Sequence, residues 1–390
     1  MTSERPERWF SHVKLKGMKP NRPPTPMESW IRLANEPGVG PVMARTILDQ
    51  FSDAHAFYLA TPDALRARLP AQVAQRALRP CAPELANIID QTLCWAAKPG
   101  HHLVTFSDPA YPPRLRQMTD APVMLFAQGD LTVLLREAIA IVGARRATPD
   151  GLDNAYAFAG YMARQGWCVV SGLADGIDGA AHQGALAAGL QGGGTIAVLG
   201  TGMDNMYPKS HAGLAAEIVD KGGLLVSELP LGSPVLPKNF PSRNRIVAGL
   251  TRGVLVVEAT LRSGSLITAR LAVEMGREVF AIPGSIHSPL TRGTHSLIQQ
   301  GAKLVECGQD ILSEFGSVAV KTAEPRARAG TAPRSPVWRA IGYDPVSAQV
   351  LQSRTGLPPE TVQLELIALE MAGSIDRREG GCVARPRPPR

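Results

Sequence analysis

The sequence of 390 residues has only five cysteines, and they are scattered. They form no CxxC pair, which argues against a disulfide framework and against a zinc site: Cys81, Cys94, Cys168, Cys307 and Cys382. We therefore expect a reduced, cytoplasmic location. No apolar run approaches the roughly 18 residues that a membrane span needs. The charged N-terminus has no apolar stretch behind it, so we expect no membrane partner and no secretory signal.

Net positive charge is also scarce in the middle of the chain. The formal charge of +7 suggests a nucleic-acid partner. However, residues 1–24 hold six Lys/Arg against two Asp/Glu, and residues 321–390 hold eleven against seven. Residues 25–320 are left with 24 basic and 25 acidic side chains. Any anion site in the central body must therefore be a local arrangement of side chains.

Residues 111–131 are predicted to be a connector of loop and strand, and from residue 139 onward the sequence alternates between strands and helices. Apolar, β-branched runs appear as "IAIVGA", "CVVSG", "TIAVLG", "GLLVSEL", "GVLVVEA", "EVFAIPG" and "AKLVE", with helical stretches between most of them. Continuous apolar strands that are each followed by a helix predict a parallel sheet covered on both faces. We expect an α/β fold of the doubly wound type, in which ligands bind beyond the carboxyl ends of the strands.

Composition divides the chain into five predicted parts. These are a tail (1–27), a helical domain (28–100), the α/β domain (101–315), a linker (316–337) and a C-terminal domain (338–390). In the helical domain, the tight turn at Gly38-Val39-Gly40 resembles a helix-hairpin-helix, whose turn amides can bind a DNA phosphate. A plain helical hairpin, with glycines for close packing, explains the same spacing.

The C-terminal domain reads as helix, turn, helix and a short hairpin around Gly380-Gly381, which predicts a winged helix-turn-helix. Such folds serve DNA binding and protein docking. The second helix, "PPETVQLELIALEMAG", carries three glutamates and no lysine or arginine, so phosphate would repel it. We favour docking or autoregulation for this domain.

The first two loops at strand ends of the α/β domain could meet an anion. In "GARRATPDG", Gly143 allows close backbone approach, and Arg145 and Arg146 stand before a helix start. The GxGxxG fingerprint is absent, so NAD or FAD is not expected. In "SGLADGIDGAAH", the turn Ser171, Gly172 and Gly176 is expected to offer free amides.

Two titratable residues of the second loop need separate interpretations. Asp178 lies where it could cap the next helix, and we favour that role over catalysis. His182 falls on an alanine-rich helix, where we expect it to be packed and not to act as a general base.

Two further loops add cations. Lys209 lies in "MYPKSH", and Lys238 opens the loop "PKNFPSRNRI". This second loop also carries Phe240, Arg243, Asn244 and Arg245, and the next helix opens with Ser263, Gly264 and Ser265. The arginines could pair internally with Asp175, Asp178 or Glu258, and we expect Arg243 or Arg245 to do this in part.

No catalytic set accompanies these donors. The sequence shows no Ser-His-Asp order, no HExxH and no Walker lysine, and no cluster of metal ligands stands out. Donors without a nucleophile or a positioned base describe a binding site, so we expect no enzyme activity, no metal and no cofactor.

These stretches together resemble the DprA/Smf family of DNA-processing proteins of bacterial natural transformation. The similarity runs through "GARRATPDG", "SGLADGIDGAAHQGAL", "MYPKSH", "SELPLGSPVLPKNFPSRNRIVAGL", "VVEATLRSGSLITARLAVEMGREVFAIPG" and "GTHSLIQQGAKLV". It covers about residues 100–310 densely. The family's Gly-Ser-Arg is Gly143-Ala144-Arg145 here, and its Tyr-Pro-x-x-Asn ends in His211.

The resemblance implies an extended Rossmann-like sheet, a helix-hairpin-helix-like or SAM-like N-terminal domain, and a C-terminal winged helix. It also implies a homodimer that binds single-stranded DNA through its backbone and helps load RecA. By motif position, six residues would lie near DNA: Arg145, Lys209, Lys238, Phe240, Arg243 and Arg245. Phosphates would then face the guanidinium groups, Asn244 would fix the loop, and Phe240 would stack on a base.

The segment "GTHSLIQQGAKLV" is the expected dimer interface, through His295, Leu297, Ile298 and Gln299. A monomer with this face covered internally is the alternative. The rival function is a Rossmann-like nucleoside monophosphate phosphoribohydrolase. Such an enzyme needs an acid near the start of its site helix. After Thr268, the first acid on that helix is Glu274. A purely structural adaptor is a third possibility.

Overall fold

The structure is a computed structural model that describes residues 23–316, 335–341, 346–377 and 383–384. The chain divides into two compact units, Met1–Ala319 and Val320–Arg390. Most of the predicted tail and linker therefore lies outside the described residues.

Helices open the first unit, as the sequence predicts. A capping box starts the first one: the Thr25 hydroxyl accepts from the N–H of Glu28, and the Glu28 carboxylate accepts from the N–H of Thr25 at 2.7 Å. Gly38, with φ at +77°, forms the turn into the second. The six helices are α1 (Pro26–Asn35), α2 (Pro41–Gln50), α3 (Ala54–Leu59), α4 (Pro62–Arg68), α5 (Ala71–Ala77) and α6 (Pro83–Ala96).

These helices pack against the sheet that follows. Ile31 of α1 and Ile89 of α6 share a core with Phe126 and Leu225 of two strands. The helical region therefore contributes to the same compact unit as the sheet. That residues 28–100 form a domain of their own stays a prediction.

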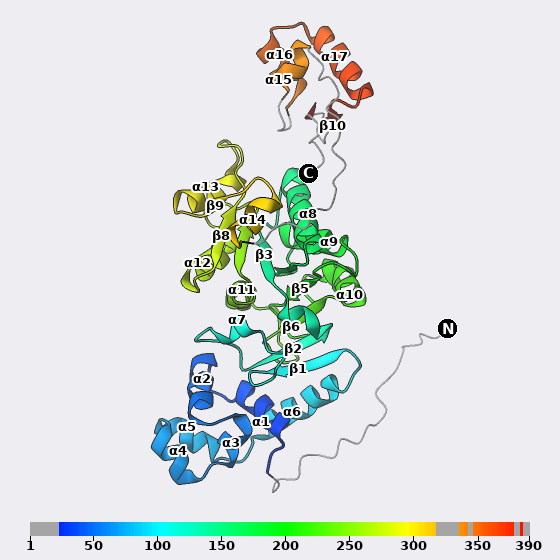
Figure 1. The fold of residues 1–390 in the computed structure, drawn as a ribbon. Helices are drawn as coiled ribbons and strands as arrows, with labels where there is room; N and C mark the ends of the chain where they lie inside the picture. Colours follow the sequence, from blue (N-terminus) through cyan, green and yellow to red (C-terminus); the bar gives the residue numbers. More distant parts are fainter. Residues whose placement is uncertain (1–22, 317–334, 342–345, 378–382, 385–390) are drawn as a thin grey trace, which may run out of the picture. The chain divides into compact units, whose positions relative to one another are not determined.

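A nine-stranded, mostly parallel sheet forms the body of the first unit, which confirms the predicted fold class (Figure 1). Its order is β1-β2-β6-β5-β4-β3-β7-β8-β9. The strands are β1 (His101–Thr105), β2 (Met124–Gly129), β3 (Ala138–Val142), β4 (Cys168–Ser171), β5 (Thr195–Val198), β6 (Leu224–Ser227), β7 (Gly253–Val256), β8 (Glu278–Ala281) and β9 (Lys303–Leu304). The seven strands from β3 to β9 coincide with the seven apolar runs of the sequence.

The edge formed by β1 and β2 is antiparallel. β1 pairs with β2 and β2 pairs with β6 in antiparallel register, whereas the remaining pairs are parallel. The sequence predicts a strand within residues 111–131, which is β2, but it does not predict β1. The short helix α7 (Pro113–Arg116) lies between them.

Helices cover both faces of the sheet because successive strand residues point to opposite sides. On one face, Ile139 and Ile141 of β3 contact α8 (Pro149–Arg164) and α9 (Ile177–Leu186). On the other, Ala140 and Val142 belong to the core that includes α11 (Asn239–Gly249) and α12 (Gly264–Glu274). The remaining helices of this unit are α10 (Ala212–Asp220), α13 (Arg292–Gln299) and α14 (Gly308–Glu314), with short 3-10 turns η1 (Leu131–Leu135), η2 (Lys209–His211) and η3 (Pro289–Thr291).

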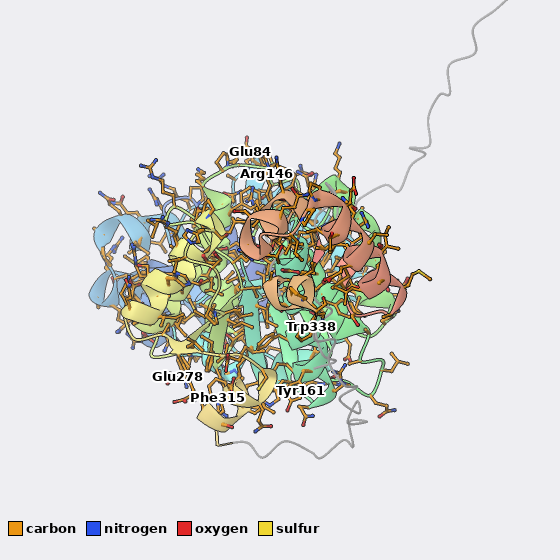
Figure 2. All side chains as sticks on the ribbon, turned by 90° about the horizontal axis from the view of Figure 1, so that it is seen from above. Glu84, Arg146, Tyr161, Glu278, Phe315 and Trp338 are labelled. Atoms are coloured by element: carbon orange, nitrogen blue, oxygen red, sulfur yellow. The ribbon has the colours of Figure 1, made fainter. Side chains whose placement is uncertain are left out.

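Aromatic rings fix the end of this unit. Phe315, labelled in Figure 2, stacks on Trp167 with ring centroids 5.0 Å apart. The guanidinium of Arg252 lies 4.5 Å from the Phe315 ring centroid on this stack. The chain therefore leaves the sheet from an anchored residue just before the predicted linker.

The second unit is a small helical domain with a two-stranded sheet. Its elements are α15 (Pro336–Ala340), α16 (Ala348–Thr355), α17 (Pro359–Met371), β10 (Asp376–Arg377) and β11 (Val383–Ala384). Val337, Leu351 and Leu366 form its core, and Gly356 ends α16 with φ at +68°. α15 starts inside the predicted linker, and the expected turn at Gly380-Gly381 lies outside the described residues. Within the described ranges, no helix has both the length and the apolar character needed to cross a membrane.

Candidate nucleic-acid interface

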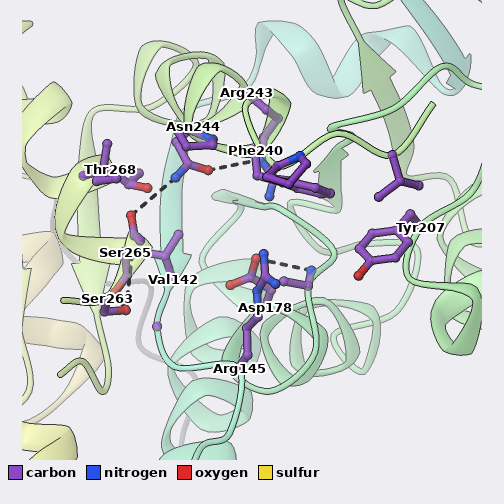
Figure 3. Close-up of a pocket in the computed structure, with 17 residues that line it drawn as sticks. Val142, Arg145, Asp178, Tyr207, Phe240, Arg243, Asn244, Ser263, Ser265 and Thr268 are labelled. Carbon is purple, nitrogen blue, oxygen red and sulfur yellow. Dashed lines mark hydrogen bonds between the residues drawn. The ribbon is translucent and has the colours of Figure 1, made fainter. Parts of the chain in front are cut away.

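A pocket of about 580 Å³ opens at the carboxyl end of β3. β3 lies between β4 and β7, and the chain runs outward from it in both directions, so this is the point where the strand order reverses. Doubly wound folds bind their ligands at such points. The pocket is lined by Val142, Gly143, Arg145, Ala174, Asp178, Tyr207, Val235, Pro237, Phe240, Pro241, Arg243, Asn244, Ser263, Gly264, Ser265, Ile267 and Thr268 (Figure 3).

The segment expected as a loop, "PKNFPSRNRI", is mostly helix, and this corrects the prediction. α11 begins at Asn239, so Pro241 occupies its third position. The first N–H groups of a helix have no partner within the helix, so proline is tolerated there. Asn244 still joins two segments, because its side-chain amide donates to the Gly264 carbonyl at 3.4 Å and its oxygen accepts from Arg243 Nε at 3.2 Å.

Arg243 forms the buried floor of the pocket. Its side chain is almost fully buried and donates to the carbonyls of Gly172 and Val198, which end β4 and β5. Burial lowers the pKa of Arg243 to about 10, and Asp178 acts in the opposite direction. A Cβ at Gly172 would overlap this guanidinium. Arg243 therefore braces the ends of two strands. An internal role was expected for one of the two arginines, but with Asp175, Asp178 or Glu258 as its partner; among the described residues neither arginine forms an ion pair with these acids.

Asp178 does not cap the following helix, contrary to the expectation. The N-cap of α9 is Gly176, and the Asp178 carboxylate accepts from the N–H groups of Gly172 and Ala174 at 3.1 and 3.4 Å. Burial raises the pKa of Asp178, and the Arg243 charge lowers it. The carboxylate thus folds the loop back onto itself.

The second loop does not offer the Gly172 amide that was expected to be free. The N–H of Gly172 is occupied by Asp178, and Ser171 is buried with its hydroxyl donating to the Ile141 carbonyl at 2.7 Å. Gly176 has φ at +78°, and a Cβ there would overlap the Ala144 carbonyl. These residues shape the loop beneath the pocket, and we remove Ser171 and Gly172 from the set proposed to contact a ligand.

Arg245 points away from the pocket. Its guanidinium pairs with Glu228 and lies 3.4 Å from an Asp120 carboxylate oxygen, and its side chain is only 11% exposed. This ion pair joins α11 to the segments after β6 and before β2. We therefore remove Arg245 from the proposed interface as well.

The remaining four expected cations are exposed. They are Arg145, Arg146, Lys209 and Lys238. Within the described part of the chain, none of them forms an ion pair with a carboxylate. Arg145 lines the pocket, whereas Lys209 and Lys238 adjoin the lining residues Tyr207 and Pro237 in sequence. These cations are available to an anionic ligand.

Aromatic side chains lie beside the cations. The Arg145 guanidinium is 5.6 Å from the ring centroid of Phe240, and the Phe240 and Tyr207 centroids are 5.5 Å apart. Figure 3 shows the three side chains around one opening. A polymer with alternating phosphates and flat bases suits this pairing of charge and ring.

The start of α12 forms another wall. Ser263 is its N-cap, and its hydroxyl lies 2.7 Å from that of Ser265. Gly264 is exposed, and a Cβ there would meet open space. This wall places hydroxyls and a helix N-terminus at the pocket, and contact of these three residues with a ligand stays a prediction.

A carboxylate of the protein itself occupies the N-terminal end of α8. Glu258, which follows β7, accepts from the N–H of Thr148 at 2.9 Å and from its hydroxyl at 2.6 Å. A negative group at a helix N-terminus is stabilising. An anion at Arg145 and Arg146 must therefore be held by their guanidinium groups without the helix end. Glu258 was expected only as a partner of arginine.

His182 is packed, as expected. It is fully buried, and its Nδ1 lies 2.7 Å from the Thr195 hydroxyl. Burial lowers its pKa to about 3. The described residues contain no group of acids, histidines and cysteines suited to a metal ion. Asp178 is the one carboxylate among the described residues that line the pocket, and two loop amides hold it.

Sequence patterns did not single out seven lining residues: Val142, Ala174, Tyr207, Val235, Pro237, Pro241 and Ile267. Tyr207, Val235 and Ile267 are each 38–39% exposed although they are apolar or aromatic. These three residues could have been found from their neighbours in the sequence. Each of them lies within two or three residues of a lysine or serine that was expected in the site.

Two family models match the chain. One, described as DNA recombination-mediator protein A, covers residues 102–316, and the other, described as the DprA winged helix domain, covers residues 321–381. The second match agrees with the helices and short sheet of the C-terminal unit and confirms the predicted winged helix.

Known proteins are similar over much of their length. Protein Smf of Escherichia coli (strain K12) is 43% identical over 303 residues, which are 76% of this chain and 80% of that protein. The DNA processing protein DprA of Streptococcus pneumoniae is 49% identical over 208 residues, or 53% of this chain and 72% of that protein. The X-ray structure of DprA from Streptococcus pneumoniae superposes with a TM-score of 0.63 at 37% identity, covering 75% of this chain and 99% of that one.

Proposed function

This chain belongs to the DNA recombination-mediator protein A family, the DprA and Smf group of DNA-processing proteins, and on that premise we propose that it binds single-stranded DNA largely without sequence preference. The strand lies across the pocket at the carboxyl end of β3. Phosphates contact Arg145, Arg146, Lys209 and Lys238, and a base stacks on Phe240.

One observation carries this proposal: unpaired cations surround an opening that also exposes aromatic rings. Arg145 lies over Phe240, and neither Lys209 nor Lys238 has an internal carboxylate partner among the described residues. Stacking tolerates any base because each base has a flat face, and phosphate contacts are the same at every position. The arrangement therefore favours binding without sequence preference.

Salt dependence tests the proposal. Each phosphate contact on a single strand adds about −0.7 to the slope of log affinity against log salt, so about four contacts predict a slope near −3. Arg145→Ala should weaken oligo-dT binding and reduce the slope by about 0.7. Lys221→Ala is the matched control, because Lys221 pairs with Glu217 and precedes β6 at the opposite end of the strands. A slope near zero, or equal affinity for blunt duplex, would refute the proposal.

A nucleoside monophosphate phosphoribohydrolase is the alternative, and the site argues against it. The Asp178 carboxylate already accepts two backbone bonds, and Glu274 lies at the far end of α12. We propose that the protein is not an enzyme. Incubation with nucleoside monophosphates should release no ribose 5-phosphate, and release that Asp178→Asn abolishes would favour the hydrolase.

Self-association through α13 is part of the proposal. Leu297 packs partly on the sheet core, His295 and Ile298 are half-buried, and Gln299 is exposed. Leu304 of β9 is 45% exposed, and Ile286, two residues after the Gly284 N–H that donates to His295, is 70% exposed. A second copy would cover this apolar surface.

A charge placed in that surface tests the dimer. Ile298→Glu should give a monomer by light scattering at micromolar concentration while the parent is a dimer, because an unpaired buried charge costs several kcal/mol. Gln300→Glu adds the same charge at an exposed neighbour and should stay dimeric. A monomeric parent, or a dimeric Ile298→Glu protein, would place the interface elsewhere.

RecA loading completes the proposal and is supported by family membership. A protein that coats single strands and then transfers them should shorten the lag of RecA filament growth on oligo-dT. Arg145→Ala should lose this effect together with its DNA binding. A full effect in that variant would separate loading from the pocket.

A further inference from the structure

The loop between β6 and α11 exposes two apolar side chains. Val235 and Leu236 are 38% and 37% exposed, in the stretch Glu228–Lys238. Single exposed apolar residues are ordinary on protein surfaces. These two are adjacent, and the loop that carries them lies at the mouth of the candidate site.

Hydrogen bonds to the backbone of this loop hold it in one conformation. The N–H of Gly232 donates to both carboxylate oxygens of Asp204 at 2.9 Å, and Asn205 donates to the Ser233 carbonyl at 3.2 Å. The N–H of Asn239 donates to the Leu236 carbonyl at 3.0 Å. Prolines at 230, 234 and 237 restrict it further. A ligand that contacts the apolar pair does not have to order the loop first.

The first residue of the apolar pair lines the pocket, and Leu236 is the next residue along the loop. Val235 lines the pocket together with Tyr207 and Ile267, and Lys238 follows two residues after Leu236. An apolar rim and a cation are thus presented by one rigid segment. Unpaired DNA offers the same combination, because flat apolar base faces alternate with phosphates along it.

We propose that Val235 and Leu236 pack against the faces of unpaired bases and are the residues by which the site selects single-stranded over duplex DNA. This inference rests on the proposed function. In a duplex the base faces are stacked inside, and the outside presents phosphates and groove edges. Exposed cations attract both forms of DNA, whereas an apolar pair gains contact area only from the unpaired form.

The experiment compares three DNA probes of equal length: oligo-dT, an abasic strand with the same phosphates, and a blunt duplex. Val235→Ser/Leu236→Ser should bind oligo-dT about tenfold more weakly, since covering two partly exposed aliphatic side chains contributes on this scale. Its affinity for the abasic strand and the duplex, and its salt slope, should equal those of the parent. Leu190→Ser is the control, because Leu190 is 76% exposed and precedes β5 at the other end of the sheet.

A second variant gives a direct spectroscopic signal. Leu236→Trp places an indole at the same exposed position, and its fluorescence should be quenched by oligo-dT but not by the abasic strand. The same ratio of oligo-dT to abasic affinity in the serine variant and the parent would overturn the inference. So would quenching by both strands alike.

Failure of the inference differs from failure of the proposed function. If the parent does not bind oligo-dT, the function fails. If the parent binds, Arg145→Ala loses affinity and the serine variant does not, only the role of Val235 and Leu236 fails. Equal loss of affinity for all three probes would assign the loop a general structural role and would also overturn the inference.

Discussion

Replacing Arg243 with methionine should destabilise the first unit without removing a phosphate contact. Methionine keeps much of the side-chain length but cannot donate to the Gly172 and Val198 carbonyls. It also leaves Asp178 buried without its cation. A hydrogen bond from a buried charged donor contributes about 1.5–3 kcal/mol, so loss of the two bonds should cost about 3–6 kcal/mol of unfolding free energy.

A double-mutant cycle isolates the contribution of the pair. Asp178→Asn alone keeps an oxygen that can accept from Gly172, so its cost should be about 1–3 kcal/mol. Arg243→Met/Asp178→Asn should be less destabilised than the sum of the single changes by about 1–3 kcal/mol, since the double variant leaves no charge unpaired. Urea unfolding followed by tryptophan fluorescence measures all four proteins.

The pH dependence of the unfolding free energy gives an independent test of the interaction between Arg243 and Asp178. Burial raises the pKa of Asp178 above its unfolded value of 3.8, so its protonated form is favoured in the folded state. Stability from this group is therefore fully present below that value and is lost as pH rises through the folded pKa. Without Arg243 that pKa rises further. Arg243→Met should lose stability from pH 4 to pH 8 relative to the double variant.

Three outcomes would refute this reasoning. One is an Arg243→Met protein within about 1 kcal/mol of the parent, which is inconsistent with a buried guanidinium that donates to two carbonyls. Another is additivity in the cycle. A third is a change in the salt dependence of oligo-dT binding. If the slope is reduced in Arg243→Met as much as in Arg145→Ala, Arg243 contacts phosphate.

Three more outcomes follow from buried groups. Gly172→Ala should lower the unfolding free energy by about 1–3 kcal/mol in calorimetry, because its Cβ would overlap the Arg243 guanidinium; Gly40→Ala, at a glycine with negative φ and open space, is the comparison without such an overlap. Arg245→Met should cost about 3 kcal/mol by leaving Glu228 buried and unpaired, and an altered salt slope would contradict its assignment. His182→Gln should flatten the loss of melting temperature between pH 6.5 and pH 4, because the folded pKa of His182 is about 3 and only the unfolded state takes up its proton there; parallel curves would count against burial of the ring.

The sequence predicted the sheet well because each parallel strand is an apolar run. Such strands are covered on both faces, so their residues are continuously hydrophobic. β1 differs, since "HHLVT" starts with two histidines, only half-buried, and pairs at an antiparallel edge. An edge strand carries a weaker pattern, and this explains why it was not predicted.

The roles of the two arginines could not be predicted because their helix was read as a loop. Residues two apart on a helix point about 200° from each other. Arg243 therefore faces the ends of β4 and β5, whereas Arg245 faces Glu228 on another side of α11. In an extended loop the two side chains would point the same way.

The exposed cations were easier to predict than the loop amides. Arg145, Lys209 and Lys238 follow strand ends or glycine-rich turns, which sequence shows directly. The N–H groups of the second loop are consumed by Asp178, a residue six positions after Gly172. Sequence identifies donors and acceptors, but the backbone path decides which of them are already satisfied.

The sheet ends at β9 with only Lys303 and Leu304 in strand conformation. Open strand edges can template the addition of further chains, and a short edge limits that growth. Two residues offer too little backbone for a stable intermolecular strand pair. Contact on this side of the molecule must then depend on side chains, and it saturates after one partner when two copies meet through the same face. Concentrated solutions should therefore contain closed assemblies and not fibrils that lengthen from this edge.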